Sequence, residues 1–472
     1  MRVGVRDRLL VAVLCGVSWL PIAFVRRGYT WDDWVLAVID SNEVRDWHRD
    51  AGRLFPLSAE LFLATGSIGV RLGTVAALIA TGLAVLSLLS RFRVFSRSEL
   101  ILVSVLASVN PLDTSKSLLV TAPYTWSLAL FFLGWALLVS RRWWVVGLPV
   151  LFVSYDTSSL LFFAVLPLLD LIYFTHPSRH RSNKFRLAGL AASVGLYAVI
   201  RFLLRPPKGS YVGYNSPGVF GLIFAVASFC GIGLLALGLF RGRSLFADLR
   251  TRGSLLAAVG VLLILVGLTP YLAVQRFPPY LTAETRHYLL VGLGVGVAVV
   301  GIARALGAFT GIPSMRHRVV TLVAVLSIAF TWFNAFLSLQ YWRFVDEVSD
   351  SLSSLEIAPG SLVLVEYEET PATALTRRIG PNYLDTWYVW TGIVDPNRDK
   401  ALLAIVATEY PRYIQGRFRN VYGDQREPWG VEGFQPTSTA IYLRIRSVGG
   451  ISGFFASHEL SRADVKVDLP VP

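Results

Sequence analysis

Two adjacent carboxylates, Asp32 and Asp33, lie between Trp31 and Trp34, just after the first apolar stretch of the chain. One carboxylate beside an acceptor hydroxyl can take its proton as a general base. The pair could instead hold a divalent cation that binds a phosphate. An amphipathic segment with interfacial Trp anchors is the simpler interpretation. The residues alone leave these open, and we take Asp32 and Asp33 as the catalytic candidates.

Cationic and aromatic side chains recur at the ends of later apolar stretches. Arg and Lys bind phosphate through charge-assisted hydrogen bonds, and aromatic rings offer apolar faces to sugars. Snorkelling at headgroup level explains any single cation, but not the gathering of many. The predicted donor-phosphate residues are Arg53, Lys116 and Arg286, and the predicted substrate-binding residues are Trp31, Trp34, Tyr124, Tyr155, Asp156 and Tyr288.

The elements that must position these residues are membrane helices. Of 472 residues, 54% are hydrophobic and only 16% charged, whereas a soluble domain carries about 25% charged residues. The net charge of +13 is concentrated in short loops between apolar runs, which is the positive-inside pattern and not a nucleic-acid-binding face. Eleven crossings are predicted, at 9–25, 70–90, 99–114, 122–139, 143–155, 157–174, 187–204, 218–240, 254–274, 288–308 and 319–340.

Topology supports keeping the fifth and sixth stretches as a pair that enters and returns. Fusing them would turn three later basic clusters outward. With the N-terminus in the cytoplasm, the cytoplasmic basic clusters are Arg91, Arg93 and Arg97; Arg141 and Arg142; Arg179, Arg181, Lys184 and Arg186; Arg241, Arg243, Arg250 and Arg252; Arg316 and Arg318.

Residues 341–472 are richer in charge and then fall outside the cytoplasm. Strand-like runs at 361–366, 402–407 and 440–445, punctuated by Pro and Gly, predict a small C-terminal α/β domain. The predicted architecture is therefore an all-α polytopic membrane bundle over 1–340 and an extracytoplasmic domain over 341–472. We find no P-loop, dinucleotide-binding glycine fingerprint or metalloprotease motif, so the energy of a transfer reaction must come with its substrate.

The order of these features resembles the GT-C superfamily of membrane glycosyltransferases, and within it the glucosyltransferases that modify O-antigen. The similarity covers roughly residues 1–175 and is architectural. The residues that carry it are Asp32 and Asp33 after the first span, Gly52-Arg53 with Pro56-Leu57, Asn110-Pro111, Tyr155, and Arg286-His287-Tyr288 before a later span. The resemblance implies an essential acidic residue in the first outer loop, a polyprenyl-linked donor and inversion of the anomeric centre.

From this we expect transfer of a sugar from a polyprenyl-phosphate donor to a cell-envelope glycan or glycolipid. The localisation expected is the bacterial plasma membrane, with the chemistry on the non-cytoplasmic face. Whether a divalent cation takes part stays open. The main alternative is a transporter or flippase of lipid-linked glycans, which should carry charges inside its spans. A structural protein whose outer domain binds partners is a third possibility.

Overall fold

A computed structural model describes most of the chain. The described residues are 3–25, 33, 41–55, 57–173, 180–208, 219, 223, 252–274, 288–312, 314–353, 357–359, 361–367, 393–394, 403–406, 439–448 and 457–466.

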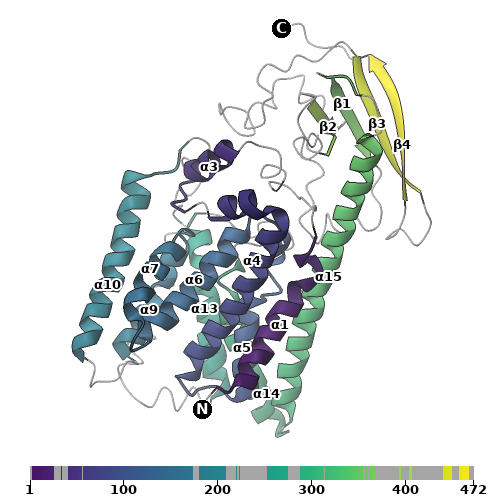
Figure 1. Ribbon diagram of the computed structural model, residues 1–472. Coiled ribbons are helices and arrows are strands. Elements are labelled where there is room, and N and C mark those ends of the chain that lie inside the picture. Colours follow the sequence, from purple (N-terminus) through teal and green to yellow (C-terminus); the bar gives the residue numbers. More distant parts are fainter. Residues whose placement is uncertain are drawn as a thin grey trace.

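The described part is mainly a bundle of helices (Figure 1). Six of its helical segments are long and apolar enough to cross a membrane: 60–90, 122–139, 183–204, 253–273, 292–310 and 315–350. The protein is therefore a helical integral membrane protein. Its helices are α1 (Val5–Ala23), α3 (Ser41–Asp50), α4 (Leu57–Ser90), α5 (Arg97–Ser108), η1 (Thr114–Ser117), α6 (Ala122–Val139), α7 (Trp144–Ser154), α8 (Leu160–Phe163), α9 (Val165–Tyr173), α10 (His180–Val199), the π-helical turn η3 (Ile200–Leu204), α13 (Gly253–Ala273), α14 (Gly292–Thr310) and α15 (Met315–Ser353).

The prediction of eleven crossings is higher than the six that the described residues show. Helix α5 has 12 residues and α7 has 11, whereas a straight crossing takes about 20. The sixth predicted span is broken into α8 and α9, and α1 begins with the charged residues Arg6, Asp7 and Arg8. The predicted span 218–240 lies almost wholly outside the described residues.

Polar contacts show which helix ends lie together at one end of the bundle, which we call the basic end. Arg97 pairs with Asp7, so α5 and α1 begin there together. The Arg91–Asp170 pair brings the end of α4 to α9. Arg186 of α10 donates to the carbonyl of Val139, where α6 finishes. The described basic clusters predicted to share one side of the membrane therefore gather at one end, beside the N-terminus (Figure 1).

Helices α7 and α9 run in opposite directions between the two ends. Asp156, just after α7, bonds to the 53–55 loop at the opposite end, which we call the site end. Asp170 of α9 returns to the basic end. Close helix contacts support this path: a Cβ added to Gly147 of α7 would lie 2.6 Å from the amide nitrogen of Leu138 in α6. Small residues allow such approach in membrane bundles.

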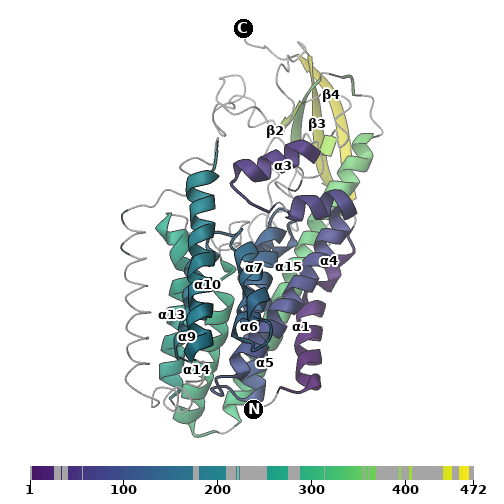
Figure 2. The same cartoon turned by 60° about the vertical axis from the view of Figure 1, so that its left-hand side comes forward.

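A four-stranded sheet lies beyond the site end, where α15 leads into it (Figures 1 and 2). The strand order is β2 (Leu403–Val406), β1 (Leu362–Tyr367), β3 (Thr439–Val448), β4 (Ser457–Lys466). Strand β1 is parallel to β2 and β3, and β4 is antiparallel to β3. The three predicted strands are confirmed. Strand β4 was missed because its sequence is largely polar.

The sheet and the helices share a hydrophobic cluster. It joins Val363 and Val365 of β1 to Trp342 and Val345 of α15 and to residues of α1. Helix α15 has 39 residues and runs through position 340, where the sequence suggested a boundary. What the structure shows is a small sheet packed onto the bundle, not a separately delimited domain.

Candidate functional site

Some of the predicted site residues lie in the described part of the chain and others lie outside it. Asp33, Arg53, Lys116, Tyr124, Tyr155, Asp156 and Tyr288 are described, whereas Trp31, Asp32, Trp34 and Arg286 lie outside the described residues. Arg53, Tyr124, Tyr155 and Asp156 come together in one group at the site end. Asp33 and Lys116 belong to a second group, and Tyr288 to neither.

Arg53 is positioned by the way α3 ends. The amide of Gly52 donates to the carbonyl of Arg49 at 2.8 Å, and that of Arg53 donates to His48 at 3.0 Å. Gly52 has φ +74°, a left-handed conformation that closes helices and suits glycine. The turn directs Arg53 inward, where its guanidinium carbon lies 4.9 Å from the centre of the Tyr124 ring. The side chain is 14% exposed.

Asp156 fixes the loop that carries Arg53. It sits in the break between α7 and α8, where its Oδ1 accepts hydrogen bonds from the amides of Leu54 at 2.7 Å and Phe55 at 3.1 Å. Its Oδ2 lies 3.5 Å from Nη1 of Arg53. The carboxylate therefore makes its shorter hydrogen bonds to backbone amides, and its contact with Arg53 is longer, at 3.5 Å.

Arg201 is the residue that sequence reasoning missed. It lies in the π-helical turn η3, and its Nη2 donates to the carbonyl of Ala51 at 3.1 Å. A Cβ on Gly52 would lie 2.2 Å from Nη1 of Arg201, so the missing side chain makes room for this guanidinium. The available signal was an Arg within the predicted span 187–204, since charged residues inside membrane spans are usually functional.

Two tyrosines line the same place. Tyr155 and Tyr197 are fully buried, with ring centres 5.8 Å apart in an edge-on arrangement. Within the described part of the chain, neither hydroxyl finds a hydrogen-bond partner, and neither does Nη1 of Arg201. Tyr197 lies within electrostatic range of Arg53, Asp156 and Arg201. We call Arg53, Asp156, Tyr155, Tyr197 and Arg201 the arginine pair site.

His48 supports the turn from the other side. Its Nδ1 lies 2.9 Å from the carbonyl of Val44, and the ring is 4% exposed. Burial, with the positive charge of Arg53 nearby, lowers the pKa of His48 from 6.5 to about 4. The imidazole is therefore neutral at pH 7 and contributes no charge to the arginine pair site.

The second group surrounds the start of α6. Asp33 is fully buried, and its Oδ1 accepts a hydrogen bond from the amide of Val120 at 2.8 Å. Lys116 lies 3.5 Å from Asp113, both side chains being 2% exposed. Burial, partly opposed by Asp113, lowers the pKa of Lys116. Lys116 is thus buried and paired inside its own turn, which gives no support to its predicted role at a phosphate.

Asn110 explains where Tyr288 lies. Its Nδ2 donates to the carbonyl of Tyr288 at 2.7 Å, and its Oδ1 accepts the amide of Leu112 at 3.2 Å. The contact fastens the segment entering α14 to the end of α5. Tyr288 therefore takes part in a structural junction through its backbone carbonyl.

The site end as a whole is suited to binding an anion. Two guanidiniums, that of Arg201 buried and that of Arg53 14% exposed, lie near one carboxylate. Buried charges in excess of their partners call for a counter-charge. Among the described residues, no group of three or more His, Cys, Asp or Glu side chains is arranged to hold a metal ion. Comparison of the sequence with protein-family models and with characterised proteins finds no match.

Proposed function

We propose that the protein is a membrane glycosyltransferase of the GT-C type. It would move a sugar from a polyprenyl-phosphate donor to a cell-envelope glycan or glycolipid at the site end. The observation that carries the proposal is the excess of guanidinium over carboxylate at the arginine pair site, at one end of a bundle of membrane helices. A lipid-linked phosphate brings its negative charge to that end of the bundle.

The proposal assigns different roles to the two adjacent carboxylates. Asp33 is held by the Val120 amide at the N-terminus of α6, so it suits an anchoring role. Asp32 is then the general base that takes the proton of the acceptor hydroxyl while the donor phosphate leaves. Trp31 and Trp34 remain candidates for contacts with the sugar or the lipid headgroup. Whether a divalent cation assists is left open.

The distribution of charge favours this over a flippase, which would need polar groups along a path through the membrane. In the six long helical segments, the buried arginines lie toward helix ends or, for Arg71, shortly after the kink of α4 at Gly66. Arg186 and Arg304 belong to the basic end. Arg201 and Arg71 belong to the site end, where Arg71 reaches the carbonyl of Val25 just beyond α1.

The test is sugar transfer from a polyprenyl-phosphate donor by purified protein in lipid nanodiscs. Asp32→Asn should lower turnover by about 10²- to 10⁴-fold, the usual contribution of a positioned base. Asp33→Asn should cost much less, because the Asn oxygen still accepts the Val120 amide. Asp46→Asn is the matched control, since Asp46 is exposed on α3 and pairs with its helix neighbour Arg49.

Near-normal transfer by both Asp32→Asn and Asp33→Asn would contradict the assignment of the base to this segment. Wild-type protein that moves the lipid-linked sugar between leaflets of a vesicle without transferring it would favour the flippase instead.

A further inference from the structure

We propose that Arg53 and Arg201 together form a clamp for one lipid-borne phosphate group, with the hydroxyl of Tyr197 as an additional donor. This inference rests on the proposed function and names the residues that would hold the donor. Arg201 was not among the residues that the sequence pointed to.

The charge of the site requires a partner. Arg53 and Arg201 contribute two positive charges, Asp156 contributes one negative charge, and His48 is neutral. Arg201 is 5% exposed and Asp156 is 9% exposed. A buried net positive charge is costly unless an anion neutralises it. A phosphate would supply that anion.

The hydrogen-bonding capacity of the site is also unfilled. Nη1 of Arg201 and the hydroxyls of Tyr155 and Tyr197 have no partner among the described residues. Buried polar groups without partners are rare, and each usually marks a missing ligand, water or functional strain. Nη1 of Arg201 and the hydroxyl of Tyr197, which lies within electrostatic range of both guanidiniums, are accounted for together by an oxyanion with several acceptor oxygens.

The backbone is shaped to present Arg201 at this place. The turn η3 is π-helical, a rare form that is frequent at functional sites. It brings Arg201 against the Ala51 carbonyl and over the bare Cα of Gly52. Gly52 thus serves two purposes: it closes α3 and leaves the space that the guanidinium of Arg201 occupies. If Arg201 had only a structural role, the hydrogen bond to the Ala51 carbonyl would be sufficient, and Nη1 would not need to lie without a partner among the described residues.

The position of Arg201 on a membrane-spanning segment favours a lipid as the source of the phosphate. Beyond Arg201 in η3, Phe202, Leu203 and Leu204 are 56%, 73% and 70% exposed. This apolar surface continues the outer face of a membrane-spanning segment. A phosphate that carries an isoprenoid chain could leave its chain against this face, whereas a free phosphate would gain nothing from it.

Binding can be measured apart from sugar transfer, by titrating polyprenyl phosphate without a sugar onto the full chain in nanodiscs. Arg201→Gln should weaken binding about ten- to a hundredfold, as expected for loss of charge-assisted bonds of about 1.5–3 kcal/mol. Gly52→Ala should weaken it as well, because its Cβ displaces Arg201. Arg45→Gln is the control, since Arg45 lies on α3 and pairs with exposed Glu60.

Tyr197→Phe keeps the test decisive if Arg201→Gln fails to fold. It removes only a hydroxyl that has no partner in the described structure, so the fold should persist while phosphate binding weakens several-fold. Wild-type affinity in both Tyr197→Phe and a folded Arg201→Gln would overturn the clamp. Inorganic phosphate or phosphatidylglycerol binding as tightly as polyprenyl phosphate would overturn its assignment to an isoprenoid lipid.

The outcomes separate this inference from the proposed function. Arg201-dependent binding of polyprenyl phosphate without any sugar transfer would leave the clamp standing and remove the glycosyltransferase proposal. Sugar transfer by the wild type, with binding unaffected in all three variants, would do the reverse.

Discussion

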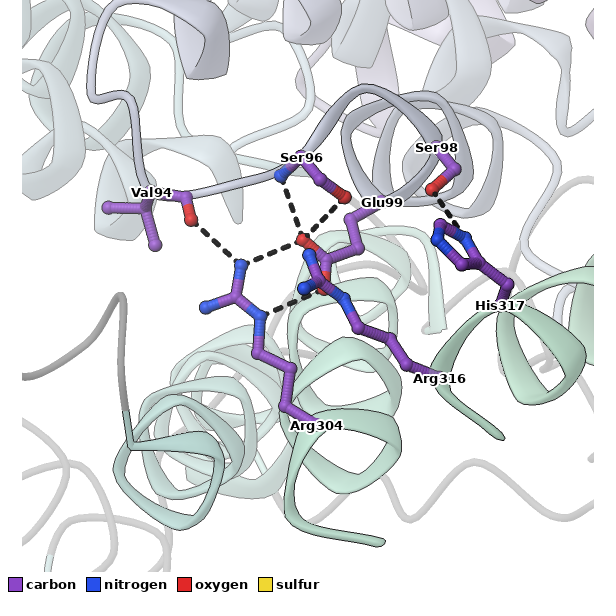
Figure 3. A network of polar contacts seen from close by, with 7 residues as sticks. All are labelled: Val94, Ser96, Ser98, Glu99, Arg304, Arg316 and His317. Carbon is purple, nitrogen blue, oxygen red and sulfur yellow. Dashed lines mark hydrogen bonds and ion pairs between the residues drawn. The ribbon is translucent and has the colours of Figure 1, made fainter. Parts of the chain in front are cut away.

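The molecule has an arginine–carboxylate cluster at each end, each with two arginines and one carboxylate, and the two differ in what the carboxylate contacts. At the basic end, Glu99 of α5 is fully buried and is contacted by Arg304 of α14 and Arg316 of α15 (Figure 3). Arg304 donates to both Glu99 oxygens, at 2.7 and 2.8 Å. The amide of Ser96 donates to Glu99 at 2.8 Å, and Arg304 also reaches the carbonyl of Val94. One carboxylate here joins three helices.

At the site end, the carboxylate is committed to loop amides and the guanidiniums keep donors open. Asp156 bonds to Leu54 and Phe55, while Arg53 is 3.5 Å away. The two clusters contain similar residue types but differ in their contacts. The network around Glu99 holds helices together, because arginines of two other helices contact its oxygens. At the arginine pair site the carboxylate binds backbone amides instead, and the ligand we propose for the two arginines is a phosphate.

Removing the carboxylate at the basic end should have the largest effect. Glu99→Gln leaves Arg304 and Arg316 facing each other without a counter-charge, and breaking a buried ion pair in this way costs about 3–5 kcal/mol. Thermal unfolding in detergent and the yield of monodisperse protein measure the loss. Glu60→Gln, which disturbs the exposed pair with Arg45, is the control and should change little. Equal effects of the two substitutions would contradict the structural role of Glu99.

A matched pair of arginine substitutions sharpens the comparison. Arg304→Gln should reduce folding, because it strips the Glu99 carboxylate of two hydrogen bonds. Arg53→Gln should leave folding nearly unchanged and lower apparent donor affinity about ten- to a hundredfold, through lost charge-assisted bonds. Both variants are compared at equal membrane abundance, by unfolding and by sugar transfer. If Arg53→Gln unfolds the protein as readily as Arg304→Gln, both clusters are structural.

Lowering the pH should destabilise the folded protein at the site end, because His48 becomes protonated. The pKa of His48 is about 4 in the folded protein, whereas the unburied imidazole has a pKa of 6.5. Between these pH values the unfolded chain therefore binds more protons than the folded protein. The contribution of neutral His48 is therefore complete above about pH 6.5 and is lost as the pH falls toward 4. His48→Gln should flatten the pH dependence of the unfolding temperature over this window. An identical pH profile in the variant would exclude His48 as its source.

Labelling perturbs the protein least and fixes which end faces the cytoplasm. In a background of Cys15→Ala and Cys230→Ala, single cysteines replace exposed Asp46 at the site end and exposed Arg142 at the basic end. A membrane-impermeant thiol reagent added to whole cells should label position 46 and not position 142, since basic loops stay in the cytoplasm. The reverse pattern would place the arginine pair site inside the cell.

The sequence by itself determined the class of the protein and much of its polarity. Apolar runs predicted membrane helices, and basic clusters predicted which helix ends lie together. The Arg91–Asp170 and Arg186–Val139 contacts agree with that grouping. Alternating apolar residues predicted β1, β2 and β3, because strand periodicity is local. Arg53, Tyr124, Tyr155 and Asp156, which lie together in the structure, were predicted as site residues from residue type and position alone.

Tertiary structure decided which of these residues lie together. Lys116 carries the same charge as Arg53, yet it is neutralised by Asp113 three residues away. Arg201 is remote from Arg53 in sequence and was overlooked, and only the π-helical turn and the bare Gly52 bring the two together. Likewise Glu99 resembles an ordinary helix-capping residue until α14 and α15 supply its arginines. Periodicity reports local burial, whereas the balance of charge in a buried site depends on helices that meet only after folding.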